Sequence, residues 1–369
     1  MNASLRVLTR RELNRATLQR QQLLQREPGS AAELIERLVG LQAQAPLAAY
    51  VALWSRLDGF DPAELSELMT SRKAVRATLL RATIHLVTAA DCLTIWPLMY
   101  PVAERGFRGA FGRQLANADL GAIIAYGTEL LSQAPYSRTK LREVLGERWP
   151  DWDANAMAYA VSYLVGSVQV TPRGVWGETG QAALQTIESW LGRKPEPNPS
   201  IDALVLRYLA AFGPASVADI QMWSGLTRLR EVVDRLRPGL RVYADEDGRE
   251  LYDVPDGPVP DAETPAPPRF LPEFDNLMLS HADRRRVNPT NRTMPLPPGN
   301  GAAMGSVLID GDYAADWRHY RGDDASLRIS THEPVGAEVR DALEAEARDL
   351  LGLIGSKDTP VVVTTGKAW

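Results

Sequence analysis

The chain has 369 residues, of which 45% are hydrophobic and 24% charged, the composition of an ordinary globular protein of two or three domains. Its single cysteine, Cys92, excludes an intramolecular disulfide framework, the N-terminus lacks the apolar core of a signal peptide, and no apolar run could span a membrane, so we expect a cytoplasmic protein with no membrane partner. The net charge of −5 argues against a chain that is basic throughout, so any surface that binds anions must be local.

Two clusters of arginines stand out on this acidic chain. The first comprises Arg6, Arg10, Arg11, Arg15, Arg20 and Arg26, and the second comprises Arg284, Arg285, Arg286 and Arg292. Either cluster could be an ordinary solvated face, but the presence of two favours a localised surface for phosphate groups.

Residues 1–95 predict a first folded unit that begins with helices. Apolar positions recur at helical spacing over 9–24, and Ser30, followed three residues later by a glutamate, is a capping-box pattern for a helix over 31–41. Asp61, followed by proline, is typical of the start of a third helix.

Two glutamines stand where the second of these helices must end. Pro46 forces the chain out of the helix, so Gln42 and Gln44 are expected on the helix end or in the turn after it. A neutral amide there can offer both a donor and an acceptor outward. The simpler alternative is that both are ordinary polar residues at a helix end.

The stretch 75–87 changes character and predicts a strand. Within it Arg81, Thr83 and His85 alternate, so in a strand they would share one face. Helices followed by a pair of strands is the order of a winged helix.

A second unit, residues 96–192, repeats this order. Helices are expected over 136–145 and 154–164, and two short strands at 168–171 and 174–176 are joined through a Pro-Arg-Gly turn. A proline-rich linker follows.

A third unit, residues 200–255, repeats the order most clearly. Ser200 caps one helix, short helices follow over 217–224 and 228–236, and an Asp-Gly turn at 247–248 predicts a hairpin. In such a unit the third helix usually enters a DNA groove, although many winged helices make only protein contacts.

A different domain is expected over residues 269–369, after a second proline-rich linker. Strands are predicted at 306–313, with a turn at Asp310-Gly311, and at 326–330; a helix is predicted over 339–354 and a closing strand over 361–364. The order of this sheet stays open. The predicted fold class is therefore mainly α with β (α+β): three tandem winged-helix units plus a C-terminal α+β domain.

Three stretches together resemble one family. They are Leu41-Gln-Ala-Gln44, Arg81-Ala-Thr-Ile-His-Leu-Val87 and Leu271-Pro-Glu-Phe-Asp-Asn-Leu-Met-Leu-Ser-His-Ala-Asp-Arg284. The chain resembles the AlkZ/YcaQ-like DNA glycosylases, which are built from tandem winged helices, and the resemblance covers nearly the whole chain. In that family a Gln-aliphatic-Gln motif carries the catalysis in the antibiotic-resistance branch, and the general bacterial branch has Asp in place of the second Gln. Gln44 therefore resembles the resistance branch.

The resemblance implies a monofunctional DNA glycosylase that hydrolyses the N-glycosidic bond of N7-alkylated purines. Its substrates would include bulky adducts or interstrand crosslinks from a DNA-alkylating natural product, in DNA repair and self-resistance. The implied partner is double-stranded DNA with an alkylated purine, bound by a nucleoid-associated monomer without a cofactor. The catalytic residues would be Gln42 and Gln44, with Thr83 and His85 near the reacting nucleotide.

The third stretch implies a further set of contacts with DNA. They would come from His281, Asp283, Arg284 and Arg286. The alternative is an internal network of salt bridges and turns that holds the C-terminal domain, and we favour it for Asp275 and Asn276. For His85 the alternative is a hydrogen-bonded structural residue. The four histidines are scattered and Cys92 has no partner, so no metal site is expected.

A pair of glutamines makes chemical sense for such a reaction. Most glycoside hydrolysis relies on two carboxylates. Alkylation at N7 already places a positive charge on guanine, so the leaving base needs no added proton. An amide can accept a hydrogen bond from water while its NH₂ group orients on DNA. We expect Gln42 and Gln44 to act from two sides of one pocket. The sequence does not indicate which of the two contributes more to catalysis.

Two rival functions remain open at this point. The first is a non-catalytic winged-helix regulator of transcription; such proteins usually dimerise, and the sequence has no heptad segment for that. The second is a protein that sequesters the free DNA-alkylating drug.

Overall fold

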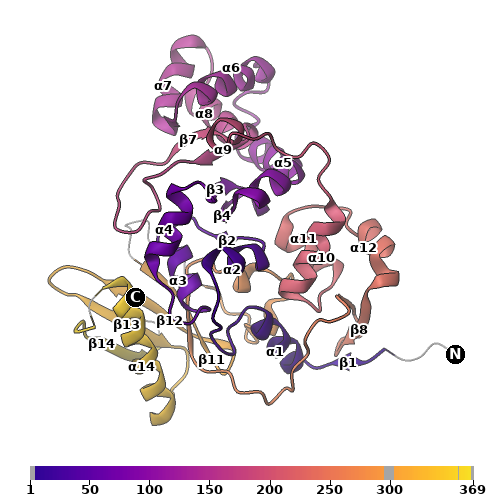
Figure 1. Ribbon diagram of the computed structural model, residues 1–369, viewed down its shortest axis with the longest axis vertical. Coiled ribbons are helices and arrows are strands. Elements are labelled where there is room, and N and C mark those ends of the chain that lie inside the picture. The colour runs from indigo at the N-terminus through magenta and orange to yellow at the C-terminus, as the bar shows by residue number, and fades with distance from the viewer. Residues whose placement is uncertain (1–4, 295–302, 356, 367–369) are drawn as a thin grey trace.

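The computed structural model describes residues 5–294, 303–355 and 357–366. Helices and three separate sheets alternate along the chain (Figure 1), which confirms the expected α+β class. In these described parts, none of the helices combines the length and the apolar character that crossing a bilayer requires.

The first unit is a winged helix. Its elements are α2 (Ala31–Arg37), β2 (Leu41–Gln42), α3 (Ala48–Trp54), α4 (Pro62–Thr70), β3 (Ala74–Thr78) and β4 (Ile84–Thr88). Helix, short strand, two helices and a hairpin follow one another, and β2 pairs antiparallel with β4. The capping box of Ser30 and Glu33 starts α2 as predicted, because both of its hydrogen bonds are local.

The second unit repeats this order after the long helix α5 (Ala89–Phe111). Its elements are α6 (Leu120–Gln133), β5 (Tyr136–Ser137), α7 (Arg138–Arg148), α8 (Ala154–Leu164), β6 (Ser167–Gln169) and β7 (Ala183–Thr186), followed by α9 (Ile187–Leu191). Together α6, α7 and α8 form one end of the molecule (Figure 1).

One strand of the second unit lies elsewhere than predicted. The expected strand over 174–176 does not form, because Gly174 and Gly177 take positive φ values of 90° and 74° and turn the chain. The hairpin partner of β6 is instead β7, with Val168 opposite Gln185.

The third unit contains α10 (Ile201–Phe212), α11 (Val217–Ser224), α12 (Arg230–Leu236), β8 (Arg241–Asp245) and β9 (Glu250–Asp253). The first two units each have a short strand after their first helix, β2 and β5. In the third unit a single β-bridge between Ala215 and Tyr252 takes its place. The N-terminal strand β1 (Val7–Leu8) adds to this hairpin, parallel to β8. Helix α1 (Arg10–Arg20) packs against α10 rather than against the first unit.

The hairpins of the first two units join into one sheet. Its strand order is β2-β4-β3-β6-β7-β5, and the junction is the pairing of Arg76 with Gln169 and of Ala77 with Val168. The glutamine-bearing strand β2 and the helices of the second unit are thus fixed to one rigid platform. The predicted boundaries between the units, at residues 95, 192, 255 and 269, stay predictions.

The C-terminal domain is a five-stranded sheet covered by a long helix. Its elements are β10 (Arg269–Pro272), α13 (Asn276–Leu279), β11 (Ala303–Ile309), β12 (Asp312–Tyr320), β13 (Ser326–Thr331), α14 (Ala337–Ile354) and β14 (Val361–Thr365). The order is β10-β11-β12-β13-β14, with only β14 parallel to its neighbour. The core between sheet and helix contains Trp317, Leu343 and Leu350.

The arginines of the first basic cluster brace α1 against other parts of the chain. Arg10 pairs with Asp312 and Arg20 with the fully buried Asp253, each at 2.7 Å. The remaining members, Arg6, Arg11, Arg15 and Arg26, also pair with carboxylates. This contradicts the expectation of a phosphate-binding surface there, because carboxylates already occupy these guanidinium groups.

Candidate active site

The first of the two glutamines lies in a strand, not at a helix end. Helix α2 ends at Arg37, and positive φ values of 57° at Val39 and 93° at Gly40 then turn the chain into β2. A Cβ on Gly40 would lie 2.5 Å from a side-chain carbon of Val87, so this tight turn requires glycine. The expected helix over 31–41 is therefore shorter than predicted.

Gln42 is held almost completely inside the protein. Its side chain and backbone are 4% exposed, and it sits opposite His85 in the pairing of β2 with β4. Its backbone N–H donates to the side-chain oxygen of Asn276 at 3.3 Å, and the amide of Asn276 donates to the carbonyl of Gly40 at 2.7 Å. Asn276 thus holds the backbone on both sides of Leu41, which is the structural role that we favoured for it from the sequence. The Gln42 side-chain oxygen accepts a hydrogen bond from Arg81 Nη2 at 2.7 Å.

Gln44 has very different surroundings. It lies in the bend after β2, is exposed, and forms no hydrogen bond with any described residue. Its side chain lines a cleft of about 580 Å³ together with Thr83. Gln42 is not among the residues that line this cleft, so the two glutamines do not face one pocket from its two sides as expected.

The opposite wall of this cleft comes from the second unit. Helix α8, the third helix of that winged helix, contributes Tyr159, Ser162 and Tyr163. These residues lie at spacings of three and four, so they share one face of the helix. The guanidinium of Arg138 lies over the ring of Tyr159, 4.5 Å from its centroid.

The cleft carries positive charge and no described acidic residue. Arg138 and Arg173 are its charged lining residues, and neither aspartate nor glutamate is present among the described residues that line it. Arg173 donates only to the carbonyl of Gly180, at 3.0 Å. The ring of Tyr159 is half-buried, because it stacks on Phe111 and lies under Arg138. The two arginines suit a ligand with phosphates.

Two arginines, the buried Arg76 and the half-buried Arg81, flank the glutamine segment on the side away from the cleft. Arg76 donates from Nη2 to the carbonyl of Ala43 at 2.5 Å, and burial lowers its pKa to about 10. Burial also lowers the pKa of Arg81 to about 10, with a further contribution from the charge of Arg284. Neither arginine has a carboxylate partner among the described residues, so the field behind Gln42 and Gln44 is positive.

Arg81, Thr83 and His85 do not share one strand face as predicted. Residues Leu80–Ala82 form a 3₁₀ turn with Arg81 at a φ of 54°, and this turn breaks the alternation. Thr83 lines the cleft, whereas His85 is completely buried beneath it. The ring Nδ1 of His85 lies 3.0 Å from the carbonyl oxygen of Thr83, so Nδ1 carries the proton. Burial, reinforced by the charge of Arg81, lowers the pKa of His85 to about 3.

His281 and Arg286 are also buried and have partners inside the protein. His281 contacts the carbonyl of Phe212 at 3.1 Å, and burial lowers its pKa to about 3. Arg286 donates to the carbonyls of Phe212 and Pro214 and to the hydroxyl of Thr17. These positions disagree with the expected contacts to DNA, since both nitrogens of the Arg286 fork are engaged and little of either side chain reaches the surface.

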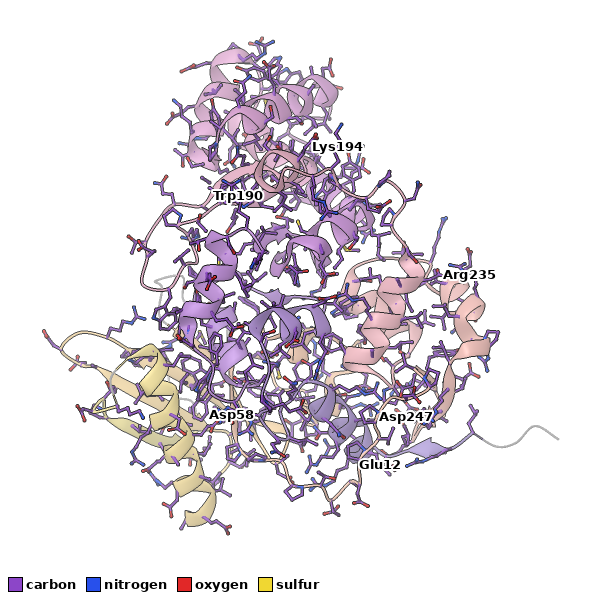
Figure 2. The ribbon with its side chains drawn as sticks, in the orientation of Figure 1. Glu12, Asp58, Trp190, Lys194, Arg235 and Asp247 are labelled. Carbon is purple, nitrogen blue, oxygen red and sulfur yellow. The ribbon has the colours of Figure 1, made fainter. Side chains whose placement is uncertain are left out.

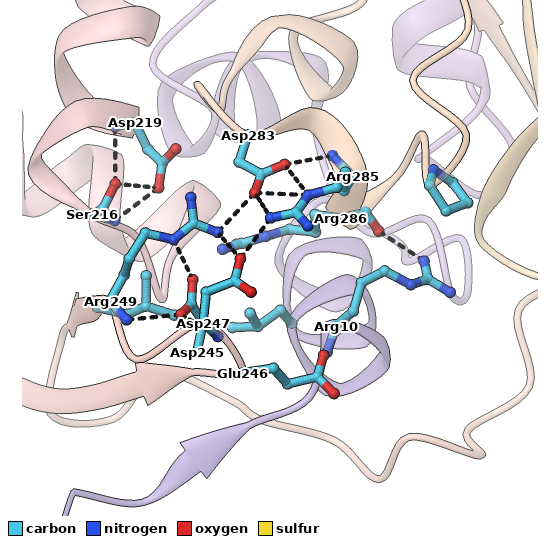
Figure 3. Close-up of a pocket in the computed structure, with 13 residues that line it drawn as sticks. Arg10, Ser216, Asp219, Asp245, Glu246, Asp247, Arg249, Asp283, Arg285 and Arg286 are labelled. Atoms are coloured by element: carbon cyan, nitrogen blue, oxygen red, sulfur yellow. Dashed lines mark hydrogen bonds and ion pairs between the residues drawn. The ribbon is translucent and has the colours of Figure 1, made fainter.

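Asp283 belongs to a network of ion pairs between the third unit and the C-terminal region (Figure 3). It accepts from Arg285 at 2.6 Å and from Arg249 at 2.8 Å, and both arginines also contact Asp247. The network borders a separate pocket of about 170 Å³. Asp283 is therefore part of an internal network of salt bridges, which was the alternative to a contact with DNA.

Arg284 differs from its neighbours. Its side chain forms no hydrogen bond or ion pair with the described residues, and it lines a third cavity, of about 360 Å³, with Glu273. Of the four residues that the sequence assigned to DNA contacts in this stretch, Arg284 is the one with free donors. In the described parts of the chain, no three histidine, cysteine, aspartate or glutamate residues gather to hold a metal ion.

Several residues of the site were missed by reasoning from sequence. Tyr159, Ser162 and Tyr163 showed a polar and aromatic helix face, but nothing in the sequence indicated that it faces Gln44. Arg81 stood inside a recognised motif, yet its contact with Gln42 depends on the turn that breaks the expected strand.

Comparisons with known proteins agree with this geometry. The family model described as DNA glycosylase AlkZ-like matches residues 35–353. The solved structure of the Streptomyces sahachiroi DNA glycosylase AlkZ superposes with a TM-score of 0.75, covering 97% of this chain and 100% of that chain at 18% sequence identity. At that identity the likeness shows the fold alone. No curated protein matches the chain.

Proposed function

The chain belongs to the AlkZ-like DNA glycosylase family and is a DNA glycosylase, and on that premise we propose that it releases N7-alkylated purines from double-stranded DNA. The proposed substrates include bulky adducts or interstrand crosslinks left by a DNA-alkylating natural product. The proposed enzyme acts as a monomer and is monofunctional, so it leaves an abasic site without cutting the strand.

The observation that carries this proposal is the cleft beside Gln44. It offers a free amide, two arginines and, among its described lining residues, no carboxylate. Without a carboxylate the cleft has no acid to protonate an ordinary purine and no strong base to activate water. A base that already carries a positive charge at N7 needs no acid, because it leaves as a neutral molecule. Holding a water in place removes part of the entropic cost of the reaction, which suits a bond weakened in this way.

The dimensions of the cleft support a bulky lesion. A volume of about 580 Å³, open on one side, exceeds what a flipped purine alone would fill. Flipping an adduct or a crosslinked base into a tight pocket is awkward, whereas an open cleft between two winged helices can accept it in place.

The surfaces around the cleft support binding to duplex DNA. Helix α8 is the third helix of its winged helix, the element that usually approaches a DNA groove. Arg138 and Arg173 in the cleft and the unpaired Arg284 are available to phosphates.

The test uses a duplex with one N7-methylguanine and a second duplex with a bulky N7 adduct. After incubation, alkali cleaves abasic sites, so strand breaks at the lesion report base release. We expect breaks with both duplexes and none with unmodified DNA. Binding without breaks would support a non-catalytic DNA-binding protein instead, and protection that needs no DNA would support drug sequestration.

The matched pair of variants is Gln44→Ala and Gln181→Ala. Both glutamines line the same cleft, but only Gln44 belongs to the motif. We expect Gln44→Ala to abolish the breaks while DNA affinity stays within a few-fold, and Gln181→Ala to keep most of the activity. Equal losses in the two variants would contradict the proposed role of Gln44.

A further inference from the structure

Arg81 connects the catalytic motif to the third unit. Its Nη2 donates to the side-chain oxygen of Gln42 at 2.7 Å, and its Nη1 donates to the carbonyl oxygen of Trp223 on α11. The guanidinium thus bridges β2 and the end of α11, two elements that are far apart in the sequence and neighbours in the fold (Figure 1).

The backbone around Arg81 is fixed on both sides. Arg81 takes a φ of 54° in its 3₁₀ turn, a conformation that L-residues adopt rarely. Gly225, at the end of α11, packs directly against it: a Cβ on Gly225 would lie 3.2 Å from the Cα of Arg81. Packing thus fixes the backbone from which the Arg81 side chain extends.

The contact determines which way the amide of Gln42 points. A guanidinium has only donors, so the atom that faces it must be the amide oxygen and not the NH₂ group. The NH₂ group of Gln42 is left to face away from Arg81. The positive charge of Arg81 also polarises the amide, which strengthens the NH₂ group as a donor and weakens the oxygen as an acceptor for water.

Arg81 differs from Arg56 and Arg20, which brace the fold through ion pairs. Arg56 and Arg20 each form a bidentate ion pair with a buried carboxylate, Asp275 and Asp253 respectively. Arg81 has no carboxylate partner among the described residues; its contacts are a neutral amide and a neutral carbonyl.

We infer that Arg81 is a positioning residue of the glycosylase reaction, which fixes the amide oxygen of Gln42 and so leaves the attacking water to Gln44. The inference rests on the proposed function. The free amide oxygen of Gln44 then accepts the hydrogen bond from the water.

The reaction balances with these roles. The bond between C1′ and N9 breaks with its electron pair going to the purine, which cancels the charge at N7. The water oxygen forms the new bond to C1′, and its proton passes to solvent, since an amide does not retain it. Gln42 itself makes and breaks no covalent bond.

The test is a double-mutant cycle with Arg81→Met and Gln42→Ala, measured as single-turnover base release from an N7-methylguanine duplex. Met has a similar length but no donor. We expect each single variant to slow release by about 10- to 100-fold, the loss expected when a catalytic group is misplaced by about 1 Å. We expect the double variant to be no slower than Gln42→Ala, while the Kd for DNA stays within three-fold.

Arg105→Met is the matched control. Arg105 also donates to the end of α11, at the carbonyl of Gly225, but it does not touch Gln42. We expect its rate to stay within two-fold of wild type. If Arg105→Met reproduced the loss, or if the effects of Arg81→Met and Gln42→Ala multiplied, Arg81 would have only a structural role and the inference would be overturned.

A second readout does not depend on activity. In protein labelled with ¹⁵N at glutamine, the side-chain signal of Gln42, assigned through Gln42→Ala, should shift in Arg81→Met and stay in place in Arg105→Met. A signal that Arg81→Met leaves unmoved overturns the positioning role alone. Absence of base release by the wild-type protein from every alkylated duplex would instead overturn the proposed function.

Discussion

At the scale of single residues, the two glutamines of the motif differ in what surrounds them. In a continuous strand Gln42 and Gln44 would point to the same side, because strand side chains alternate with a period of two. Strand β2 ends at Gln42, however, and the chain bends before Gln44, so one amide is enclosed and the other opens into the cleft. This difference permits a division of work between two chemically identical side chains.

The sequence could indicate these residues but not their exposure. The roles of the motif, His85 and Thr83 were predicted from the resemblance to the AlkZ/YcaQ-like family. Whether His85, His281 and Arg286 reach the surface depends on which distant segments cover them, for example Phe212 over His281. Such contacts between residues far apart in the chain leave no local pattern.

The burial of His85 predicts how stability depends on pH. The folded protein keeps His85 neutral down to a pH of about 3, because burial lowers its pKa. The unfolded chain binds a proton below about pH 6.5, so the contribution to stability is complete above that value and falls as the pH drops, by about 1.4 kcal/mol per pH unit. The free energy of unfolding, measured by urea titration at pH 7.5 and 5.0, should fall less in His85→Gln than in wild type.

The comparison between the two proteins removes contributions that they share. Burial raises the pKa of Glu273 to about 7 and works in the opposite direction, since the folded protein then binds the extra proton, but it does so equally in both proteins. An equal fall in wild type and His85→Gln would contradict a neutral, buried His85.

At the scale of elements, helix ends were predictable and strand partners were not. The starts of α2, α8 and α11 agree with the helices expected from residues 31, 154 and 217. Ser30, Asp153 and Ser216 each cap one of them by accepting a hydrogen bond from the backbone N–H three positions later, which is a local contact. The sequence analysis placed the partner of β6 at 174–176 instead of at β7. The error arose because the position of β7 depends on pairing across the connecting loop. The sheet order of the C-terminal domain was left open for the same reason.

The three winged helices present their third helices differently. On α12, Arg235 pairs with Asp202 and lies at the outer edge of the molecule (Figure 2). Helix α4 is preceded by Asp61 and carries Glu64 and Glu67. Of the three, α8 is the one that meets the cleft of Gln44, so the repeated fold does not imply three equal contacts with DNA.

We predict that the charges beside α8 matter for DNA binding and those on α12 do not. Arg138→Ala should weaken binding to a duplex several-fold and reduce the slope of log K against log salt by about one unit, because one phosphate contact is lost. Arg235→Ala is the control, since its guanidinium already has a carboxylate partner. Fluorescence anisotropy at several salt concentrations measures both. An unchanged slope in Arg138→Ala would argue against a phosphate at this position.

At the scale of the whole molecule, the C-terminal domain completes the site of the N-terminal unit. The turn after β10 supplies Asn276, which clamps the backbone of Gln42, and the adjacent Asp275 caps α13 and pairs with Arg56 beyond the end of α3. The first unit and the segment after β10 thus meet behind the glutamines. The C-terminal stretch that carries the family resemblance therefore has a structural role. It supports the backbone of Gln42, which is far from it in the sequence.

We predict that breaking this buried ion pair destabilises the whole fold. Arg56 and Asp275 are 0% and 2% exposed, with contacts of 2.8 Å and 3.0 Å, so Asp275→Ala would leave a buried guanidinium without a counter-charge. The expected loss is about 3–5 kcal/mol in the free energy of unfolding, measured by urea titration. Asp247→Ala is the control: it removes an acceptor from the exposed Arg285, where an ion pair contributes about 0–1 kcal/mol. A similar small loss in both variants would mean that the C-terminal domain is not anchored through Asp275, and the clamp on Gln42 would then need another support.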